Sequence, residues 1–241
     1  GFDDKLDTLK LKTDLIVLPE MFNTGFTMNV DKCAETMDGK AMQWLKQKAQ
    51  ALQSVIAGSL LIKEKNMYFN RLIWMKPDGS YEYYNKRHLF RMVNEHHTIS
   101  QGKERKIVTL KNWKINLQVC YDLRFPVWSK NNYADKKHEY DVLLYVANWP
   151  EIRNHAYKIL IPARAIENQA YVVWVNRVGE DGNKIMHAGE SMVVNPKGIK
   201  VINANAHHEE ILHTTLSAKE LIYFRQKFQI GLDWDQFSIN N

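Results

Sequence analysis

The stretch WKINLQVCYDLRFP spans residues 113–126 and indicates how the chain folds around its reactive group. Its first seven residues form a largely apolar run that stops at the thiol of Cys120, and Pro126 suits the first turn of a helix. A buried strand that ends in this way presents the sulfur at the edge of a sheet, where ligands bind in α/β proteins. A lone free cysteine is more often a small core residue. The role of Cys120 therefore depends on partners elsewhere in the sequence.

Three further predicted strands also stop at polar side chains. They are residues 14–18, which lead to Glu20, residues 81–84, which lead to Lys86, and residues 140–147, which lead to Asn148 and Trp149. The first of these is continuously apolar after Asp14, which is typical of a strand buried on both faces. Because ligands bind beyond the carboxyl ends of strands, we expect these side chains to converge with Cys120 on one mouth.

This combination of residue types suits covalent catalysis by a thiol. The pKa of a free cysteine is about 8.5, so attack on an amide carbon needs a nearby base. Glu20 is the candidate base, because a partly desolvated carboxylate accepts protons near working pH. Lys86 and the backbone N–H of Tyr121 are candidates for stabilising the oxyanion. Taken singly, each has a simpler interpretation: Glu20 as a loop acid, Lys86 as a surface charge and Cys120 as core.

Three motifs around these residues resemble the signatures of the nitrilase superfamily of carbon-nitrogen hydrolases. They are LPEMF at 18–22, YNKRHLF at 84–90 and VCYDLRFP at 119–126, in the family's order, with further matches at 146–150, 163–168 and 189–198. Residues 91–97 and the neighbourhood of Cys120 look most like bacterial omega-amidases, which hydrolyse the side-chain amide of 2-oxoglutaramate and 2-oxosuccinamate. The resemblance implies an amidohydrolase that forms a thioester and releases ammonia. Close relatives of that type act instead on N-carbamoyl amines, nitriles or deaminated glutathione.

The resemblance also assigns further residues. It implies that Glu95 is a second acid, which orders the lysine and the substrate amide, although a surface position for Glu95 is an equal alternative. Tyr121, Asn148 and Trp149 are candidates for substrate binding, and Trp149 is as readily a core residue. We interpret Arg124 as an ion-pair partner of Asp122 that holds the Cys120 turn, with binding of a substrate carboxylate as the alternative. Arg164 and Glu167 are expected to share one helix face in a structural or interfacial role.

The fold that the resemblance implies is α+β, a four-layer αββα sandwich that dimerises. No Gly, Ser or Pro-rich linker divides residues 1–241, so we expect a single domain. The family's first strand has no counterpart, and the sequence opens in what resembles the end of the first helix. The elements that the patterns predict are helices at 40–52, 152–169 and 218–228, strands at 54–61 and 171–178, a turn at 180–183, and hairpins of 68–75 with 81–84 and of 191–194 with 199–203. We expect the apolar tail at Trp234 and Phe237 to pack on a partner subunit.

Composition narrows the remaining possibilities. The net charge is +6 and the pI about 9.1, but basic residues are scattered among acids, which favours a solvated surface over nucleic-acid binding. No apolar stretch approaches the roughly 20 residues of a membrane span. Two cysteines do not make a disulfide framework, and a catalytic thiol suits the cytoplasm. We therefore expect a cytoplasmic homodimer acting on a small-molecule amide, with no cofactor.

Two other classes of protein are alternatives to a thiol amidase. A metal-dependent hydrolase would draw on the nine histidines, but the adjacent pairs His96–His97 and His207–His208 point apart in a regular element, so no metal site is expected. Activity that survives chelation would remove this alternative. A catalytically silent scaffold is disfavoured by the intact Glu20, Lys86 and Cys120 set. A Cys120→Ala variant equal to the wild type would revive it.

Overall fold

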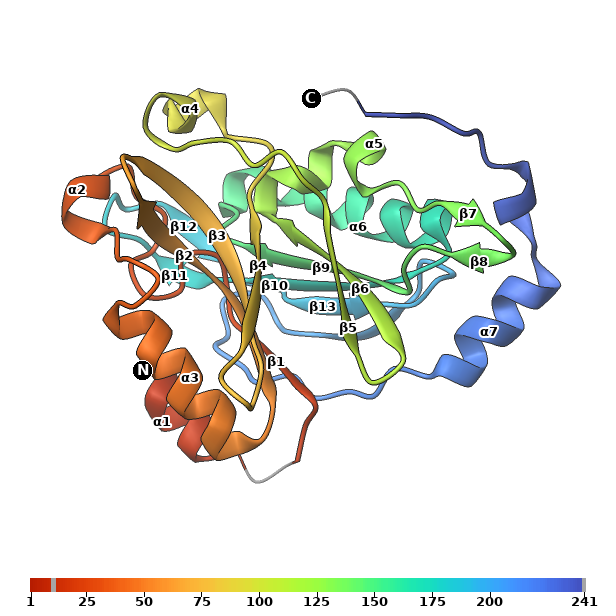
Figure 1. Ribbon diagram of the computed structural model, residues 1–241, viewed down its shortest axis with the longest axis horizontal. Coiled ribbons are helices and arrows are strands. Elements are labelled where there is room, and N and C mark those ends of the chain that lie inside the picture. The colour runs from red at the N-terminus through yellow and green to blue at the C-terminus, as the bar shows by residue number, and fades with distance from the viewer. Residues whose placement is uncertain (10–11, 240–241) are drawn as a thin grey trace.

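Two β-sheets lie face to face between helices in the computed structural model, which describes residues 1–9 and 12–239 (Figure 1). The first sheet has the order β1-β2-β3-β4, with β1 at Leu15–Val17, β2 at Val55–Glu64, β3 at Met67–Met75 and β4 at Tyr81–Asn85. The second has the order β14-β13-β10-β9-β6-β5, with β5 at Lys106–Leu110, β6 at Trp113–Val119, β9 at Val142–Ala147, β10 at Tyr171–Asn176, β13 at Met192–Val194 and β14 at Lys200–Asn203. Two short hairpins pair β7 (Tyr133–Ala134) with β8 (Lys137–His138) and β11 (Val178–Glu180) with β12 (Met186–Ala188).

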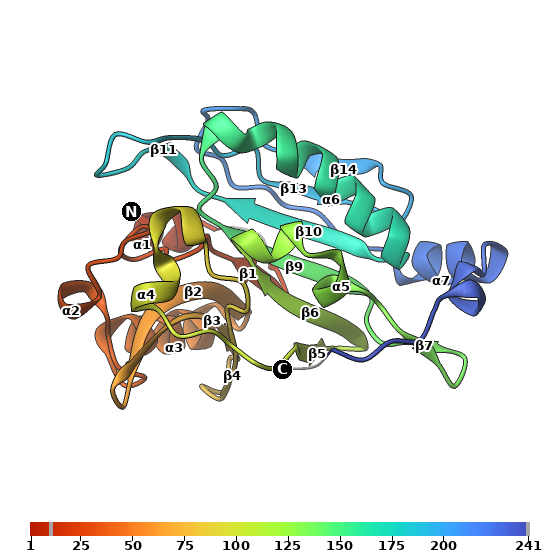
Figure 2. The same ribbon diagram turned by 90° about the horizontal axis from the view of Figure 1, so that it is seen from above.

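Helices cover the outer face of each sheet. The α-helices are α1 at Phe2–Asp7, α2 at Val30–Cys33, α3 at Lys40–Leu52, α4 at Glu95–Thr98, α5 at Pro126–Ser129, α6 at Asn154–Asn168 and α7 at Ala218–Lys227. The 3-10 helices are η1 at Arg91–Val93, η2 at Cys120–Arg124, η3 at Glu151–Arg153 and η4 at Ile230–Asp233. Figure 2 shows the layers in sequence: α6, the six-stranded sheet, the four-stranded sheet and α3. The expected α+β architecture of αββα layers is confirmed. None of the helices in the described residues is long and apolar enough to cross a membrane.

Two hydrophobic cores follow from the alternation of side chains along the first sheet. Successive residues of a strand point to opposite faces. Val55 and Ala57 of β2 therefore join Trp74 of β3 in the core between the two sheets. Ile56, which lies between them in sequence, packs with Leu45 of α3 in the core beneath the helices. Burial on both faces explains why this sheet reads as near-continuous apolar runs.

Strand directions bring the polar strand ends together. Strands β6 and β9 are parallel, with Val119 opposite Val146, so the residues that follow each strand emerge side by side. In the other sheet β1 is parallel to β2, and β4 is related to β2 by two antiparallel pairings, so β1 and β4 end at the same edge. The Glu20 N–H donates to the Ala147 carbonyl at 3.3 Å and joins the two edges. The expected mouth therefore lies between two sheets, not at the edge of one.

Most expected elements occur, with small shifts at their ends. The helix predicted at 152–169 begins at Asn154 because η3 occupies the preceding turn, and the strand predicted to reach residue 178 ends at Asn176. Both hairpins are present, and the residue 180–183 turn lies between β11 and β12. The Ser217 hydroxyl accepts from the Glu220 N–H at the start of α7, as a helix cap.

The C-terminal segment packs on its own chain. The Trp234 ring lies 3.9 Å from the Lys130 ammonium, measured to the ring centroid, and 5.5 Å from the His138 ring. Phe237 stays exposed. The Trp234 ring is therefore partly covered by a cation and an imidazole of its own chain, and packing of this segment on a partner subunit stays a prediction.

Candidate active site

Cys120 is the first residue of η2 and follows β6 directly. Its φ of 43° lies in the left-handed region, which a non-glycine residue rarely adopts. Strain of this kind persists where the surrounding structure fixes it, and it clusters at functional sites. The side chain is 8% exposed and borders a cavity of about 330 Å³. The turn therefore presents the sulfur to the cavity, as the sequence predicts.

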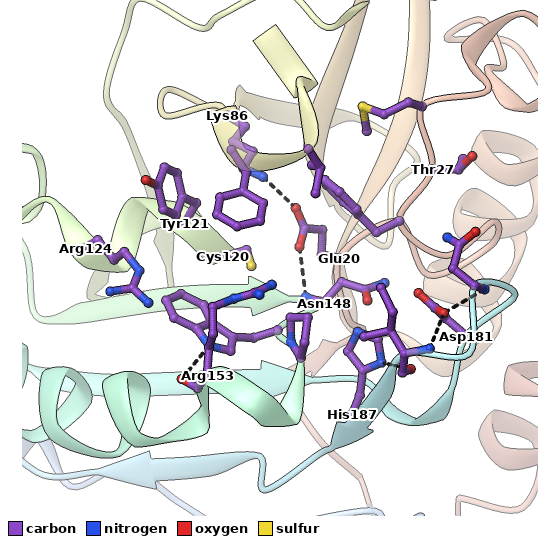
Figure 3. A pocket seen from close by; sticks show the side chains of 18 residues that line it. Glu20, Thr27, Lys86, Cys120, Tyr121, Arg124, Asn148, Arg153, Asp181 and His187 are labelled. Atoms are coloured by element: carbon purple, nitrogen blue, oxygen red, sulfur yellow. Dashed lines mark hydrogen bonds and ion pairs between the residues drawn. The ribbon is translucent and has the colours of Figure 1, made fainter.

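The Asp122 carboxylate holds this turn in place. It accepts hydrogen bonds from the Val119 N–H at 2.9 Å, the Tyr84 hydroxyl at 2.8 Å and the His88 N–H at 3.0 Å. Asp122 therefore ties the nucleophile turn of one sheet to the end of β4 in the other. The prediction that Asp122 pairs with Arg124 is wrong. Residues two apart in a helical turn do not face each other, and Arg124 points to the cavity (Figure 3).

Helix α6 supplies a second support for the same turn. The Arg164 guanidinium donates two hydrogen bonds to the Leu123 carbonyl, at 2.7 and 3.1 Å, and forms a 3.0 Å ion pair with Glu167. Arg164 is buried, so these bonds are made away from solvent. The expected shared helix face of Arg164 and Glu167 is confirmed, and the role of Arg164 within the chain is structural.

Glu20 is buried at the edge between the two sheets. Its Oε1 accepts from the Asn70 amide at 2.6 Å and from the Lys86 ammonium at 3.0 Å, while Oε2 accepts from the Asn148 backbone N–H at 2.8 Å. All three partners are donors. An ionised carboxylate can only accept hydrogen bonds, so three donors around Glu20 suit its ionised form. The ionised form is also the one that can accept a proton.

Lys86 lies between two buried carboxylates. Its Nζ is 3.0 Å from Glu20 Oε1 and 3.0 Å from both oxygens of Glu95. Burial opposes the positive charge, but the charges of Glu20 and Glu95 outweigh it and raise the pKa of Lys86, so the amine stays an ammonium. Burial also raises the pKa of Glu95. Glu95 is 0% exposed, so the surface alternative for this residue is wrong.

The environment of Cys120 disfavours its thiolate in the free protein. Burial raises the pKa of the thiol most strongly, the Glu20 charge raises it further, and Lys86 acts in the opposite direction. The sulfur therefore keeps its proton until a base removes it. In Figure 3 the Glu20 carboxylate lies between Lys86 and Asn148, to which its two oxygens are hydrogen-bonded, with the Cys120 sulfur beside it. The side chain able to take the proton is thus at hand.

The three residues expected to bind substrate all line the cavity, with different surroundings. The Tyr121 ring packs on Phe90, at 5.0 Å between centroids. The Asn148 side-chain oxygen is buried and has no hydrogen-bond partner among residues 1–9 and 12–239. The Trp149 ring packs against Trp174 at 5.8 Å, and its N–H donates to a backbone carbonyl. Trp149 is therefore mainly a wall, whereas Asn148 offers a free acceptor.

Sequence reasoning missed Arg153 and His187, which also line the cavity. Arg153 is the last residue of η3, in the loop that follows β9. Arg153 and Asn148 both follow β9, and this position after the strand is the signal that could have identified Arg153. His187 comes from the β11–β12 hairpin, which lies outside the three catalytic motifs and carries no signal of its own. No group of three or more His, Cys, Asp or Glu side chains suited to a metal occurs in the described part of the chain.

A comparison with known families decides the assignment. The sequence model of the carbon-nitrogen hydrolase family matches residues 7–226. The chain belongs to the carbon-nitrogen hydrolase family. The resemblance seen in its three motifs is thereby confirmed, and the protein is an amidohydrolase of the nitrilase superfamily.

Individual relatives of this carbon-nitrogen hydrolase match over almost its whole length. It is 42% identical to omega-amidase YafV of Escherichia coli K12 over 238 residues, which are 99% of this chain and 90% of the relative. It is 30% identical to the 2-oxoglutaramate amidase of Bacillus subtilis over 220 residues, which are 90% of this chain and 83% of the relative. The crystal structure of a superfamily protein from Xanthomonas campestris, with an arsenic adduct in its active site, superposes with a TM-score of 0.96 at 43% identity, covering 99% and 91% of the two chains.

Proposed function

We propose that this carbon-nitrogen hydrolase cleaves the side-chain amide of a small 2-oxo acid amide, such as 2-oxoglutaramate or 2-oxosuccinamate. The products would be the dicarboxylate and ammonia. The observation that carries the chemistry is the buried Glu20–Lys86 pair on the same cavity as Cys120. The substrate class is supported by relatives named omega-amidase and 2-oxoglutaramate amidase, which match nearly all of the chain.

Acylation begins with Glu20 as the general base. As the Cys120 sulfur attacks the amide carbon, its proton passes to the Glu20 carboxylate, which removes the cost of forming a free thiolate in a buried site. The carbonyl oxygen becomes an oxyanion that Lys86 and the Tyr121 backbone N–H stabilise. Glu20 then returns the proton to the amide nitrogen, the C–N bond breaks, and ammonia leaves a thioester on Cys120.

Deacylation reuses the same groups with water as the nucleophile. As the water oxygen attacks the thioester carbon, Glu20 takes one of the water protons. The same donors stabilise the second oxyanion. Collapse breaks the C–S bond, and the proton passes from Glu20 to the departing sulfur. Glu95 keeps Lys86 charged and directed at the oxyanion, because its two oxygens hold the ammonium from the far side.

Asn148 is suited to orienting the amide before attack. Its backbone N–H is committed to Glu20, but its buried side-chain oxygen lacks a partner among the described residues. A substrate amide N–H would satisfy that oxygen, and a nitrile offers no such donor. A buried acceptor left unpaired is costly, so the site discriminates in favour of amides.

The test is ammonia release with 2-oxoglutaramate, glutamine, a nitrile and an N-carbamoyl amino acid as substrates. We expect 2-oxoglutaramate to have the largest kcat/KM, Cys120→Ala to release no ammonia, and Glu20→Gln to block acylation. Mass spectrometry after a brief pulse should find the acyl group on Cys120. A preference for glutamine, the nitrile or the carbamoyl compound would overturn the substrate assignment within the superfamily, and an adduct on another residue would overturn the mechanism.

We also propose that the protein is a homodimer that pairs through α6. Ile159 and Ile166 of α6, and Ile152 of the preceding turn η3, recur every seven residues, and all three are exposed. Exposed Ile199 extends the stripe, because the turn at Gly198 abuts Ile166. An apolar patch of this kind is rare on a monomer, and a two-fold axis would bury it against itself. Light scattering should give twice the chain mass for the wild type and the chain mass for Ile159→Glu; a monomeric wild type would contradict the proposal.

We also propose that the protein is cytoplasmic and that it folds as a single domain. Cys33 and Cys120 are both free, and a thiol nucleophile stays reduced in the cytoplasm. The family match over residues 7–226 includes strands of both sheets, which supports one domain. Cell fractionation tests the location, and a single cooperative unfolding transition seen alike by fluorescence and circular dichroism tests the domain.

A further inference from the structure

Two arginines form one side of the catalytic cavity. Arg124 ends η2, the turn that begins at Cys120, and Arg153 ends η3 in the loop that follows β9. Both line the cavity together with Cys120 and both are half-buried. In Figure 3 they lie on one side of the Cys120 sulfur, with Thr27 and Asp181 on the other. Two guanidinium groups from separate elements therefore lie on the same side of the reacting sulfur.

Neither guanidinium has a partner of its own. Among residues 1–9 and 12–239, neither Arg124 nor Arg153 donates a side-chain hydrogen bond or forms an ion pair with an acid. The arginines that do so are Arg71, Arg87, Arg105, Arg164, Arg177 and Arg225. Arg91 also makes none, but it is exposed to water. Taking a charged group partly out of water without a partner is unfavourable, so two such groups on one wall call for an anion.

Aromatic rings hold both guanidinium groups ready. The Arg124 Cζ lies 4.8 Å from the centroid of the Trp149 ring, and the Arg153 Cζ lies 5.0 Å from the Phe90 ring. A guanidinium stacked on an aromatic face leaves its N–H donors free for carboxylate recognition. The two stacking contacts fix the side chains in advance and reduce the entropy lost when a ligand binds.

The acids around the cavity are already engaged. Glu20 and Glu95 both contact the Lys86 ammonium, and Asp181 accepts the Asn183 and Ile185 backbone N–H groups at 2.8 and 2.9 Å. None of them is paired with an arginine. The positive charge on this wall is therefore left for a ligand to balance.

We propose that Arg153 and Arg124 bind the free carboxylate of the substrate while Cys120 attacks the amide at its other end. The inference rests on the proposed function and names the part of the site that selects a substrate with a free acid group. A carboxylate accepts paired N–H donors from a guanidinium in a bidentate arrangement, which fixes direction as well as position. The amide is thereby directed toward the sulfur.

The electrostatics of Arg153 agree with this assignment. Burial lowers the pKa of Arg153, a negative charge on the Cys120 sulfur acts in the opposite direction, and the Arg124 charge lowers it again. A carboxylate between the two guanidinium groups would relieve their mutual repulsion. The subsite should therefore bind the dicarboxylate product as well, and the product should compete with the substrate.

Kinetics on paired substrates test the subsite. Ammonia release would be measured with 2-oxoglutaramate and with butyramide, a neutral amide, for the wild type, Arg153→Gln, Arg153→Lys and the exposed control Arg91→Gln. We expect Arg153→Gln to raise KM for 2-oxoglutaramate about 100-fold with little change in kcat, because it removes a charge-assisted pair. Arg153→Lys should fall between the two, since an ammonium lacks the planar fork. Arg153→Gln should lower kcat/KM for butyramide far less than for 2-oxoglutaramate, and all kinetics of the exposed control Arg91→Gln should equal those of the wild type.

An equilibrium measurement separates binding from chemistry. Calorimetry would follow 2-oxoglutarate binding to Cys120→Ala and to Cys120→Ala combined with Arg153→Gln or Arg124→Gln. We expect each arginine substitution to weaken binding, and unchanged binding in both would overturn the proposal. Equal losses with both amides would also overturn it, because a subsite for the carboxylate affects only the charged substrate. A wild type that prefers butyramide would contradict the proposed function, whereas a preference for 2-oxoglutaramate that survives in the arginine variants would contradict only this subsite.

Discussion

At the scale of single residues, the site keeps a neutral nucleophile beside a charged pair. Burial and the Glu20 charge raise the pKa of the Cys120 thiol, while Lys86 stays an ammonium because Glu20 and Glu95 both contact it. The thiol therefore keeps its proton in the free protein. Because Lys86 is buried between two carboxylates, the ion pairs are a structural requirement of the site, whatever their part in the reaction.

Removal of Lys86 should cost stability as well as activity. We expect Lys86→Met to lower the free energy of unfolding by about 3–5 kcal/mol, because two buried carboxylates lose their shared partner. Urea unfolding of Lys86→Met and of Lys86→Met with Glu95→Gln checks the cause. The double variant should regain part of the loss, since only one buried charge remains. Equal unfolding midpoints for the two variants would contradict this explanation.

His138 should make stability depend on pH. Burial, aided by the Arg225 charge, lowers the pKa of His138 from 6.5 to about 4. Between those values the unfolded chain binds a proton that the folded chain does not, so stability falls as the pH falls from about 6.5 to about 4. We expect His138→Gln to remove about 2 kcal/mol of that decline in urea titrations across this range, with a discount for partial exposure. The exposed His213→Gln should show the wild-type slope; an unchanged slope in His138→Gln would refute the assignment.

At the scale of elements, the residues that follow several short strands meet at a shared edge. Lys86 follows β4 directly, and its carbonyl accepts a hydrogen bond from the Gly102 N–H at 2.9 Å. The segment around Gly102 therefore holds the backbone of Lys86 in place. A Cβ at residue 102 would lie 2.0 Å from the Asn85 carbonyl oxygen. Only glycine permits that approach, which makes residue 102 part of the support of the site although it lies far from Lys86 in sequence.

Gly102→Ala should therefore disturb both folding and catalysis. We expect a loss of about 3 kcal/mol of unfolding free energy, because the clash is with backbone and not with the end of a flexible side chain. Activity should fall as Lys86 is displaced. Gly182→Ala is the matched control, since a Cβ there meets nothing within 4 Å, and it should stay within about 0.5 kcal/mol of the wild type by thermal unfolding. Similar melting temperatures for both variants would argue against the steric account.

At the scale of the whole molecule, the site depends on how the two sheets meet. Glu20 and Lys86 come from the four-stranded sheet and Cys120 and Asn148 from the six-stranded sheet. Asp122 and the Tyr84 hydroxyl connect the two sheets within the buried core. A shift of one sheet against the other would separate the base from the nucleophile without changing either strand.

Tyr84→Phe tests that connection. The Tyr84 hydroxyl donates to Asp122 and accepts from the Trp128 and Arg87 N–H groups, so its removal leaves three buried or half-buried partners short of a bond. We expect a loss of about 2–3 kcal/mol in urea unfolding, together with lower kcat. Tyr81→Phe, at an exposed position of the same strand, should be neutral. If the two variants unfold alike, the link between the sheets is not a source of stability.

Most of the local structure could be read from the order of residues alone. Continuous apolar runs predicted the strands that are buried on both faces, and the residues that end those runs include Glu20, Lys86 and Cys120. Both patterns can be recognised in the sequence because each depends only on residues within a few positions of one another. In the structure Glu20, Lys86 and Cys120 all line one cavity.

The partners of the charged groups, in contrast, depend on how the two sheets pack. Asp122 bonds to Tyr84 and His88 from the other sheet instead of to nearby Arg124, and Arg153 joins the cavity from a loop without a motif. A carboxylate or guanidinium is directed by whatever donor, acceptor or ring lies within a few ångströms, and that depends on how distant strands pack. Backbone periodicity carries no record of those distances, so the choice of partner appears only when the sheets are in place.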